Sequence, residues 1–309
     1  MTEGPSSSHI AALVVGFNPD VRVLDDLLAS LVNDAPTVIF IDNGGGESFL
    51  KGRVVLRSRV NYVRLDSNLG LGHALNEGFR RAIDQGCRYV ATFDQDSSPP
   101  PGMIPGLLEA HRRLEAQGIR CAAVGPRFFD RREGGKTFFP LYKEQGGTIT
   151  KCPSPDKESG LFDVDVLITS GMLVNTEIWR EGITYNPGLF VDYTDTDWCF
   201  RARNAGYKLF VCPEQEMGHA LSDAPPIRFL GLNFLRYSPI RRYYYFRNTV
   251  YFIRQRYVSW AWKRRLLMGL VVRLFSNVFI DEHKWLGLKM TTQGLVHGIK
   301  GRLGAYHRQ

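Results

Sequence analysis

The sequence predicts an α/β protein built on a doubly wound, mostly parallel sheet with helices on both faces, followed by a helical C-terminal region. Short apolar runs alternate with helical segments through the first 227 residues, and polar residues or glycines close each run. From residue 228 onward the chain becomes strongly basic. Strands that alternate with helices form parallel sheets, and such sheets bind ligands beyond the carboxyl ends of their strands.

Four apolar runs have the length and composition of buried strands, and they cover residues 10–17, 37–41, 60–65 and 89–93. Helical segments with apolar residues on one face are expected at residues 21–31, 75–83 and 198–205. The stretch 127–160 is rich in glycine, proline and charge, and we expect an irregular surface loop there.

Polar side chains follow each of the four strands, and these are Asn18, Asp42, Asn68, Asp94 and Asp96. Each alone is also a common turn residue, because Asn and Asp bond to their own backbone. Four consecutive strand ends of this kind favour a ligand site along one edge of the sheet. The carboxylates of Asp94 and Asp96, one residue apart, suit a hard divalent cation and the phosphates that it binds.

The composition and the motifs exclude several classes of protein. The 309 residues are 44% hydrophobic and 23% charged, as in ordinary globular proteins. The five cysteines include no Cys-x-x-Cys pair, and residues 1–8 do not resemble a signal peptide, so we expect a cytoplasmic protein without disulfides or a zinc cluster. The glycines at 70 and 72 lack the third glycine of a dinucleotide fingerprint, and no P-loop is present.

The net charge of +8 is unevenly distributed along the chain. Residues 228–309 contain 16 Lys and Arg, with Asp281 and Glu282 as the only acids, whereas residues 1–227 contain 23 Lys and Arg and 29 Asp and Glu. The paired prolines at 225 and 226 should interrupt any regular element. We therefore expect a catalytic or binding domain at 1–225 and a second region at 226–309.

The C-terminal region combines aromatic and basic residues with two helical segments, which begin near residues 241 and 266. Its apolar run at 266–280 is too short and too polar to span a bilayer. Two interpretations remain: the helices lie on an anionic membrane surface, or they pack on the first domain. No nucleic-acid recognition motif is present.

Several motifs occur in an order that resembles glycosyltransferase family 2, the nucleotide-sugar-dependent enzymes with the GT-A fold. The motifs are Val14-Val15-Gly16-Phe17-Asn18, Ile41-Asp42-Asn43-Gly44, Asn68-x-Gly70, Asp94-Gln95-Asp96, Ser170-Gly171-Met172-Leu173-Val174 and Asp195-Thr196-Asp197-Trp198. The resemblance covers roughly residues 10–222. The motifs around Asp94 and Asp195 look most like the bacterial rhamnosyltransferase branch, which uses dTDP-L-rhamnose to build surface polysaccharides.

This resemblance implies a role for each matching residue. The nucleotide-sugar site would comprise Phe17, Asn18, Asp42, Asn68, Gly70, Asp94 and Gln95, with Asp42 recognising the pyrimidine. The metal site for Mg²⁺ or Mn²⁺ would comprise Asp96, His219 and Asp94. Asp195 would be the catalytic base, and Asp197 and Trp198 would bind the acceptor. Thr194 stands where the family usually has Glu, so acceptor contacts attributed to that Glu do not carry over.

The resemblance implies an inverting transfer of rhamnose to a saccharide or lipid-linked saccharide. Because the C-terminal region is basic and aromatic, we expect the protein to be peripheral on the inner face of the plasma membrane. Two alternatives stay open. One is a family 2 enzyme with another donor, such as UDP-galactofuranose or UDP-glucose, because one aspartate cannot distinguish thymine from uracil. The other is a non-catalytic subunit that binds a nucleotide sugar. The oligomeric state is also open.

Overall fold

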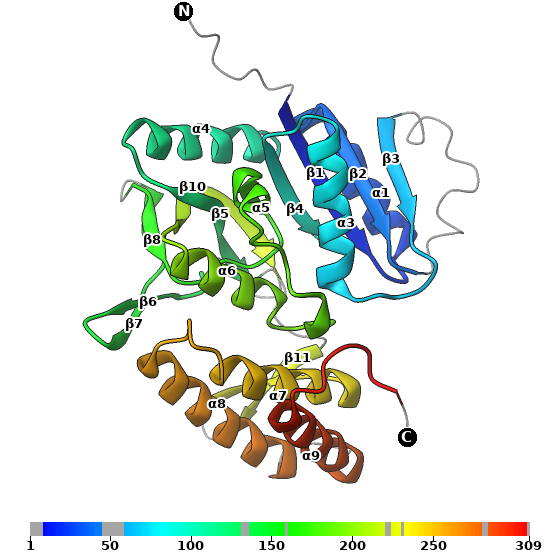
Figure 1. Cartoon of the computed structure of the whole chain (residues 1–309), viewed down its shortest axis with the longest axis vertical. Helices are drawn as coiled ribbons and strands as arrows, with labels where there is room; N and C mark the ends of the chain where they lie inside the picture. Colours follow the sequence, from blue (N-terminus) through cyan, green and yellow to red (C-terminus); the bar gives the residue numbers. More distant parts are fainter. Residues whose placement is uncertain are drawn as a thin grey trace, which may run out of the picture.

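The computed structural model describes residues 9–44, 59–130, 136–157, 160–219, 224–229, 232–279 and 284–307. The strands of its main sheet are β1 (Ile10–Gly16), β2 (Thr37–Asp42), β3 (Val60–Arg64), β4 (Tyr89–Asp94), β5 (Cys121–Asp130), β8 (Phe162–Val164), β9 (Met172–Asn175) and β10 (Lys208–His219). Within these ranges the eight strands are ordered β3-β2-β1-β4-β9-β5-β10-β8 (Figure 1).

The sheet is mixed but mostly parallel. Strands β1 to β4 pair in parallel, and β10 runs parallel to β5. Strand β9 inserts antiparallel between β4 and β5, and β8 is an antiparallel neighbour of β10. All seven residues of β1 are buried, as expected for a strand that helices cover on both faces. The predicted fold class is confirmed.

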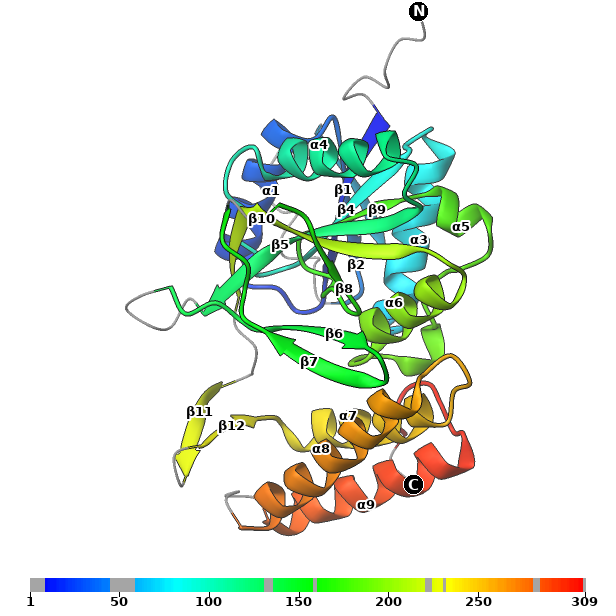
Figure 2. The ribbon, with the colours of Figure 1, turned by 90° about the vertical axis from the view of Figure 1, so that its left-hand side faces the viewer.

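Helices cover both faces of this sheet (Figure 2). The helices of this part are α1 (Val21–Asp34), α3 (Leu71–Asp84), α4 (Met103–Ala116), α5 (Glu177–Arg180) and α6 (Thr194–Asn204), with a 3₁₀ turn at Pro187–Leu189. Apolar residues of α1 and α4 pack with Ile10, Ala12 and Val14 of β1, whereas those of α3, α5 and α6 pack with the alternate residues of that strand. The period-two alternation of β1 therefore contributes to two separate cores.

Single residues explain where α1 begins and why α3 packs closely on the sheet. Asp20 caps α1, because its side chain accepts hydrogen bonds from the backbone N–H groups of Arg22 and Val23. Gly78 lets α3 approach β1, since a Cβ atom at this position would lie 2.2 Å from Leu13 Cδ1. A larger residue at 78 would force the helix away from the sheet.

The C-terminal helices α7 (Pro239–Ile253), α8 (Trp260–Phe279) and α9 (Lys284–Lys300) form a layer beneath the carboxyl edge of the main sheet (Figure 1). Helices α7 and α9 touch at two glycines of α9, where a Cβ atom on Gly294 or Gly298 would lie 2.6 Å from a backbone oxygen of α7. This region packs on the rest of the protein, which was one of the two interpretations. Among the helices that the structure describes, none has both the length and the hydropathy to cross a membrane.

Two expectations about irregular segments are wrong. The stretch 127–160 contains a hairpin of β6 (Leu141–Gln145) and β7 (Thr148–Cys152), because Gly146 and Gly147 both adopt the positive φ that a tight hairpin turn requires. The prolines at 225 and 226 lie inside β11 (Ala224–Phe229), which pairs with β12 (Leu232–Arg236) in a two-stranded ribbon. The register of this ribbon shifts at the prolines, and such an irregularity tolerates a missing N–H donor.

Candidate active site

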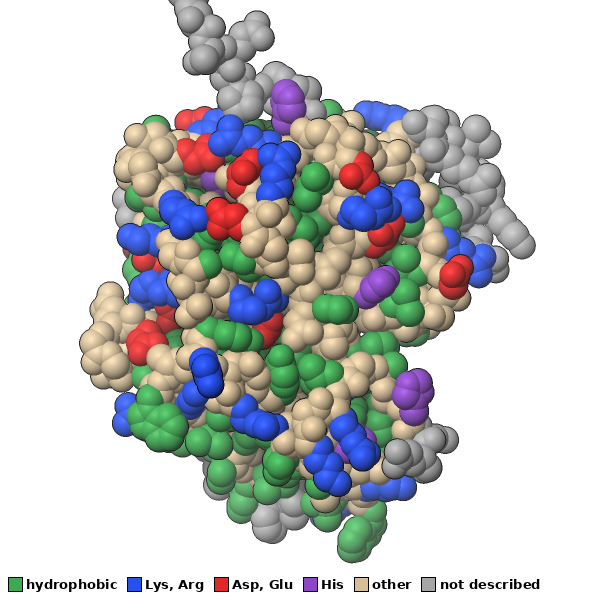
Figure 3. Space-filling view, viewed as in Figure 1, with side chains coloured by type: hydrophobic (Ala, Val, Ile, Leu, Met, Phe, Trp, Pro, Cys, Tyr) green, Lys and Arg blue, Asp and Glu red, His purple; other side chains and the backbone are tan. Residues whose placement is uncertain are grey.

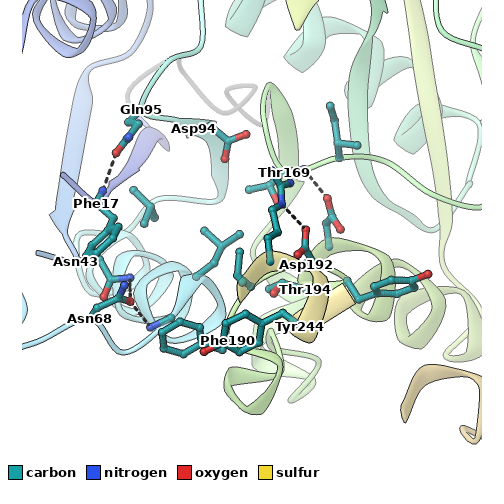
Figure 4. Close-up of a pocket in the computed structure, with 18 of the residues that line it drawn as sticks. Phe17, Asn43, Asn68, Asp94, Gln95, Thr169, Phe190, Asp192, Thr194 and Tyr244 are labelled. Atoms are coloured by element: carbon teal, nitrogen blue, oxygen red, sulfur yellow. Dashed lines mark hydrogen bonds and ion pairs between the residues drawn. The ribbon is translucent and has the colours of Figure 1, made fainter. Parts of the chain in front are cut away.

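A pocket of about 800 Å³ opens between the carboxyl edge of the main sheet and helix α7 (Figure 4). Four parts of the chain form its walls. The strand ends and the loops after them contribute Val15, Phe17, Asn43, Asn68, Gly70, Leu71, Asp94, Gln95 and His219. The loop before β9 contributes residues 168–169, the turn into α6 and the start of that helix contribute residues 190–195, and the C-terminal region contributes Ile240, Arg241, Tyr244 and Tyr306.

Side-chain amides fix the loops at one end of the pocket. Gln95 accepts a 2.6 Å hydrogen bond from the backbone N–H of Phe17, which ties the end of β1 to the turn after β4. Asn43 donates to Asn68 Oδ1 at 3.0 Å and accepts from the backbone N–H of Leu69 at 2.9 Å. The Phe17 side chain, 47% exposed, lines this end, so its ring is available for stacking on a base.

Asn18 and Asp42 lie beside this end of the pocket and are not among the lining residues. Asp42 is fully buried and accepts hydrogen bonds from the Tyr62 hydroxyl at 2.6 Å and from the backbone N–H of Gly44 at 2.9 Å. Base recognition by Asp42 stays a prediction. Its neighbour Asn43 lines the pocket. Asn43 is part of the motif Ile41-Asp42-Asn43-Gly44, which could have indicated it as a site residue.

Acidic residues from β4 and α6 meet in the pocket. Burial raises the pKa of Asp94 to about 7, the charges of Asp96 and Asp195 add to this rise, and the charge of Arg241 opposes it. Burial also raises the pKa of Asp195, while hydrogen bonds from Thr196 and from the backbone N–H of Thr169 partly offset the effect. The carboxylates of Asp96 and Asp195 therefore lie close enough to Asp94 to affect its protonation.

His219 reaches the same pocket from the end of β10. An antiparallel bridge joins Ser98 to Gly218, so the residue before His219 pairs with the turn that carries Asp96. The histidine ring packs edge-on against Phe128, with 5.7 Å between the ring centres. The predicted metal residues Asp94, Asp96 and His219 thus lie on one side of the molecule, although they come from the end of β4, the turn after it and the end of β10.

The residues present fit a divalent cation. Burial, and then the charges of Asp96 and Asp195, raise the pKa of Asp94, and a bound cation would offset the repulsion among these carboxylates. Within the described ranges no three His, Cys, Asp or Glu side chains converge as a ready-made metal site. Mg²⁺ is usually held by one or two carboxylates together with phosphate oxygens of a ligand, so this arrangement suits an ion that binds with its ligand.

Asp197 and Trp198, which were expected to bind the acceptor, lie outside the pocket wall. Both side chains are fully buried, and neither lines the pocket. Asp197 accepts hydrogen bonds from Arg201 Nε at 2.8 Å and from the Tyr257 hydroxyl. The Trp198 ring donates to the carbonyl oxygen of Ile183 at 3.0 Å. Trp198 therefore packs in the core between α6 and the main sheet, whereas Asp197 links α6 to the C-terminal region through Tyr257.

Sequence reasoning missed the strained turn that precedes α6. Phe190, Asp192 and Tyr193 have φ of 66°, 56° and 64°, which non-glycine residues seldom adopt. This turn brings Asp192 and Thr194 to the pocket wall. The motif around Asp195 marked the segment, but no local pattern predicts the turn's conformation.

Two threonines of the pocket wall, Thr169 and Thr194, have buried hydroxyl groups (Figure 4). Thr169 and Thr194 are 3% and 1% exposed. Neither Oγ1 atom has a hydrogen-bond partner within the described part of the protein. Buried hydroxyls are normally paired, so these two are candidates for contacts with a ligand.

The sheet order and the helices on both faces define the GT-A fold, and solved structures support this assignment. GalNAc-T7 with UDP, GalNAc and Mn²⁺ matches with a TM-score of 0.60 and 13% identity, over 96% of this chain and 57% of that chain. TarS residues 1–349 from S. aureus, in complex with UDP-GlcNAc, match with a TM-score of 0.53 and 13% identity, over 94% of this chain and 81% of that chain.

Sequence comparison points to one family. The model of glycosyl transferase family 2 matches residues 14–160. The dTDP-rhamnosyl transferase RfbF of Shigella flexneri is 26% identical over 298 residues, which are 96% of this chain and 98% of that protein. The predicted resemblance to glycosyltransferase family 2 and the predicted fold are confirmed.

Proposed function

We propose that this protein is an inverting, divalent-metal-dependent glycosyltransferase that transfers L-rhamnose from dTDP-L-rhamnose to a saccharide acceptor during surface polysaccharide synthesis. The observation that carries the proposal is the pocket in which Asp94, Asp195 and His219 meet, with Asp96 in the adjacent turn. The full-length similarity to a protein named as a dTDP-rhamnosyl transferase supports the choice of donor.

Asp195 is the proposed catalytic base. An acceptor hydroxyl that attacks the anomeric carbon loses its proton, and a carboxylate within hydrogen-bond reach can accept it, which typically accelerates a reaction by ~10²- to 10⁴-fold. Burial raises the pKa of Asp195, so its carboxylate is a better proton acceptor than an exposed one. The backbone N–H of Thr169 and Thr196 orient this carboxylate. Because a single displacement inverts the anomeric centre, a β-linked donor would give an α-linked product.

Asp96, Asp94 and His219 would hold Mg²⁺ or Mn²⁺, and the bound ion would neutralise negative charge on the departing diphosphate. Phe17 would stack on the base, while Asn18, Asp42, Asn68, Gly70 and Gln95 would shape the nucleotide site. Two observations support these assignments: the Phe17 ring is exposed, and the side-chain amides of Gln95 and Asn68 accept hydrogen bonds that fix the neighbouring loops.

A donor screen with the purified full-length protein tests this proposal. Release of dTDP from dTDP-L-rhamnose, and no release of a nucleoside diphosphate from UDP-galactofuranose or UDP-glucose, is the expected result. Turnover of another donor alone would favour the alternative enzyme. Asp195→Asn should keep the affinity for dTDP and lose transfer, whereas Asp26→Asn, an exposed carboxylate on α1, should keep both. Wild-type protein that binds donor and never turns over would instead be a non-catalytic subunit.

We further propose that the C-terminal region, residues 226–309, completes the catalytic domain and binds the anionic inner face of the plasma membrane, where the acceptor would be lipid-linked. Helices α8 and α9 contain no Asp or Glu. Hydrophobic and basic side chains gather over them (Figure 3), and Met268, Val271 and Trp285 are 70%, 68% and 86% exposed. Contact between two copies through this face would bring like charges together, whereas anionic lipid complements them.

Vesicle sedimentation tests the membrane proposal. The protein should bind vesicles that contain phosphatidylglycerol, bind less at high salt, and leave phosphatidylcholine vesicles unbound. Met268→Glu and Trp285→Glu should weaken binding, and Val23→Glu on α1, where the residue is 39% exposed, should not. Dimerisation through this face without binding to either vesicle would contradict the proposal.

A further inference from the structure

The first turn of α7 forms part of the pocket wall through Ile240, Arg241 and Tyr244. Arg241 is the one Lys or Arg among the lining residues that the structure describes. It faces the carboxylates of Asp94, Asp192 and Asp195 in the same pocket. A basic residue of the C-terminal region therefore stands among the acids of the candidate active site.

Several contacts hold the Arg241 guanidinium in this position. Its Nε atom lies 3.1 Å from Asp192 Oδ1, and its central carbon lies 4.7 Å from the ring centre of Tyr237. The side chain is 33% exposed, so a ligand in the pocket can reach it. Its charge also lowers the pKa of Asp94, against the effect of burial. Arg241 is therefore within electrostatic reach of the acid that ends β4.

A nucleoside diphosphate that enters this pocket brings additional negative charge close to the carboxylates of Asp94, Asp192 and Asp195. A guanidinium is planar and presents five N–H donors, so it can contact a phosphate and keep a carboxylate partner. Hydrogen bonds between such charged groups are about twice as strong as those between neutral groups. A cation beside the departing diphosphate would also stabilise the charge that develops there.

We propose that Arg241 binds the diphosphate of the donor, so that the C-terminal helix α7 supplies part of the donor site. The inference rests on the proposed function only in that the donor is a sugar linked to a nucleoside diphosphate, whichever base and sugar it carries. Arg241 would then be a second positive group at the diphosphate, on the α7 side of the pocket.

Binding measurements on the full-length protein test the role of Arg241. Calorimetric titration should show that Arg241→Gln weakens dTDP binding by ~10- to 100-fold, the range expected for hydrogen bonds to a charged group. Binding of thymidine, followed by ligand-observed NMR, should change by less than about 2-fold, because thymidine has no phosphate. Arg241→Lys should give an intermediate affinity for dTDP. Arg256→Gln, at an exposed position outside the pocket, is the matched control and should bind like the wild type.

A double variant separates direct contact from mere neutralisation of Asp192. If Arg241 only balances that carboxylate, Asp192→Asn combined with Arg241→Gln will restore the wild-type affinity for dTDP, and the proposal is overturned. If Arg241 contacts the diphosphate, the double variant stays weak. Unchanged dTDP binding in Arg241→Gln, or equal losses for dTDP and thymidine, would also overturn it.

Failure of the proposed donor gives a different result. If the wild-type protein prefers UDP to dTDP, the rhamnose donor is wrong, and the Arg241 variants are compared with UDP and uridine instead. The expected loss for the diphosphate is the same, since the base does not enter the inference. Wild-type protein that binds no nucleoside diphosphate would overturn both proposals.

Discussion

The side-chain amide of Asn248 donates a 2.7 Å hydrogen bond to the carbonyl oxygen of Val191. The same nitrogen lies 2.9 Å from the carbonyl oxygens of Leu189 and Asp192. Asn248 is fully buried in α7, and the turn that it holds carries the positive φ values before α6. Strained backbone persists where surrounding contacts enforce it. The C-terminal region therefore helps to fix the backbone conformation of the turn that positions Asp195.

Asn248→Leu should disrupt this turn. Loss of the amide leaves buried carbonyl oxygens without their donor, which should lower the free energy of unfolding by about 1–3 kcal/mol. Transfer should fall by roughly 10²-fold, since a shift of about 1 Å in a catalytic group has that effect. Denaturant unfolding and initial rates measure the two quantities. Asn204→Leu, at an exposed position on α6, is the control, and an equal loss of activity there would contradict the role of Asn248.

Asp197→Ala should affect stability and not the acceptor site. Removal of this buried carboxylate leaves Arg201 and Tyr257 without their partner, so the free energy of unfolding should fall by roughly 2–4 kcal/mol. The acceptor KM, measured well below the unfolding temperature, should stay unchanged. Asp84→Ala, in a pair whose side chains are 57% and 60% exposed, should change stability by less than about 0.5 kcal/mol. A large rise in acceptor KM for Asp197→Ala would restore the original expectation.

Thr194→Val should preserve stability and impair transfer. The Thr194 hydroxyl has no partner within the described residues, so replacing it with a methyl group should leave the free energy of unfolding unchanged or slightly higher. Thr249 donates to the carbonyl oxygen of Tyr245 at 2.7 Å, and Thr249→Val should therefore cost about 1 kcal/mol. Transfer by Thr194→Val should fall by ~3- to 10-fold if the hydroxyl contacts a substrate. Similar destabilisation of both variants would indicate that Thr194 bonds within the protein.

The raised pKa of Asp94 predicts a stability that depends on pH. Its pKa is about 7 in the folded protein and close to the ordinary value of 3.8 when unfolded. Between these values the folded state keeps a proton that the unfolded state has lost, so this contribution to stability decreases as the pH rises from about 4 to about 7. Asp94→Asn should raise the unfolding temperature more at pH 8 than at pH 5, with both measured in EDTA. An equal shift at both pH values would contradict this pKa.

Much of the sheet and of the pocket could be predicted from local patterns. Apolar runs with polar ends specified the strands, and parallel pairing then brought Phe17, Asn68 and Asp94 to one edge. The prediction held because period-two burial and turn chemistry are properties of neighbouring residues. The hairpin at 141–152 was missed because its alternation is weak, although its paired glycines carried the turn signal.

The sequence by itself determined the fold class, the family resemblance and two acids of the pocket, Asp94 and Asp195, since each depends on short motifs. Tertiary structure alone decided which other polar residues reach the pocket. It buried Asp197 and Trp198 in the core, brought Arg241 of α7 to the pocket wall, and placed Asn248 of α7 against the turn before α6. The physical reason is that burial and hydrogen bonding between distant segments depend on how the layers pack, which no local pattern encodes.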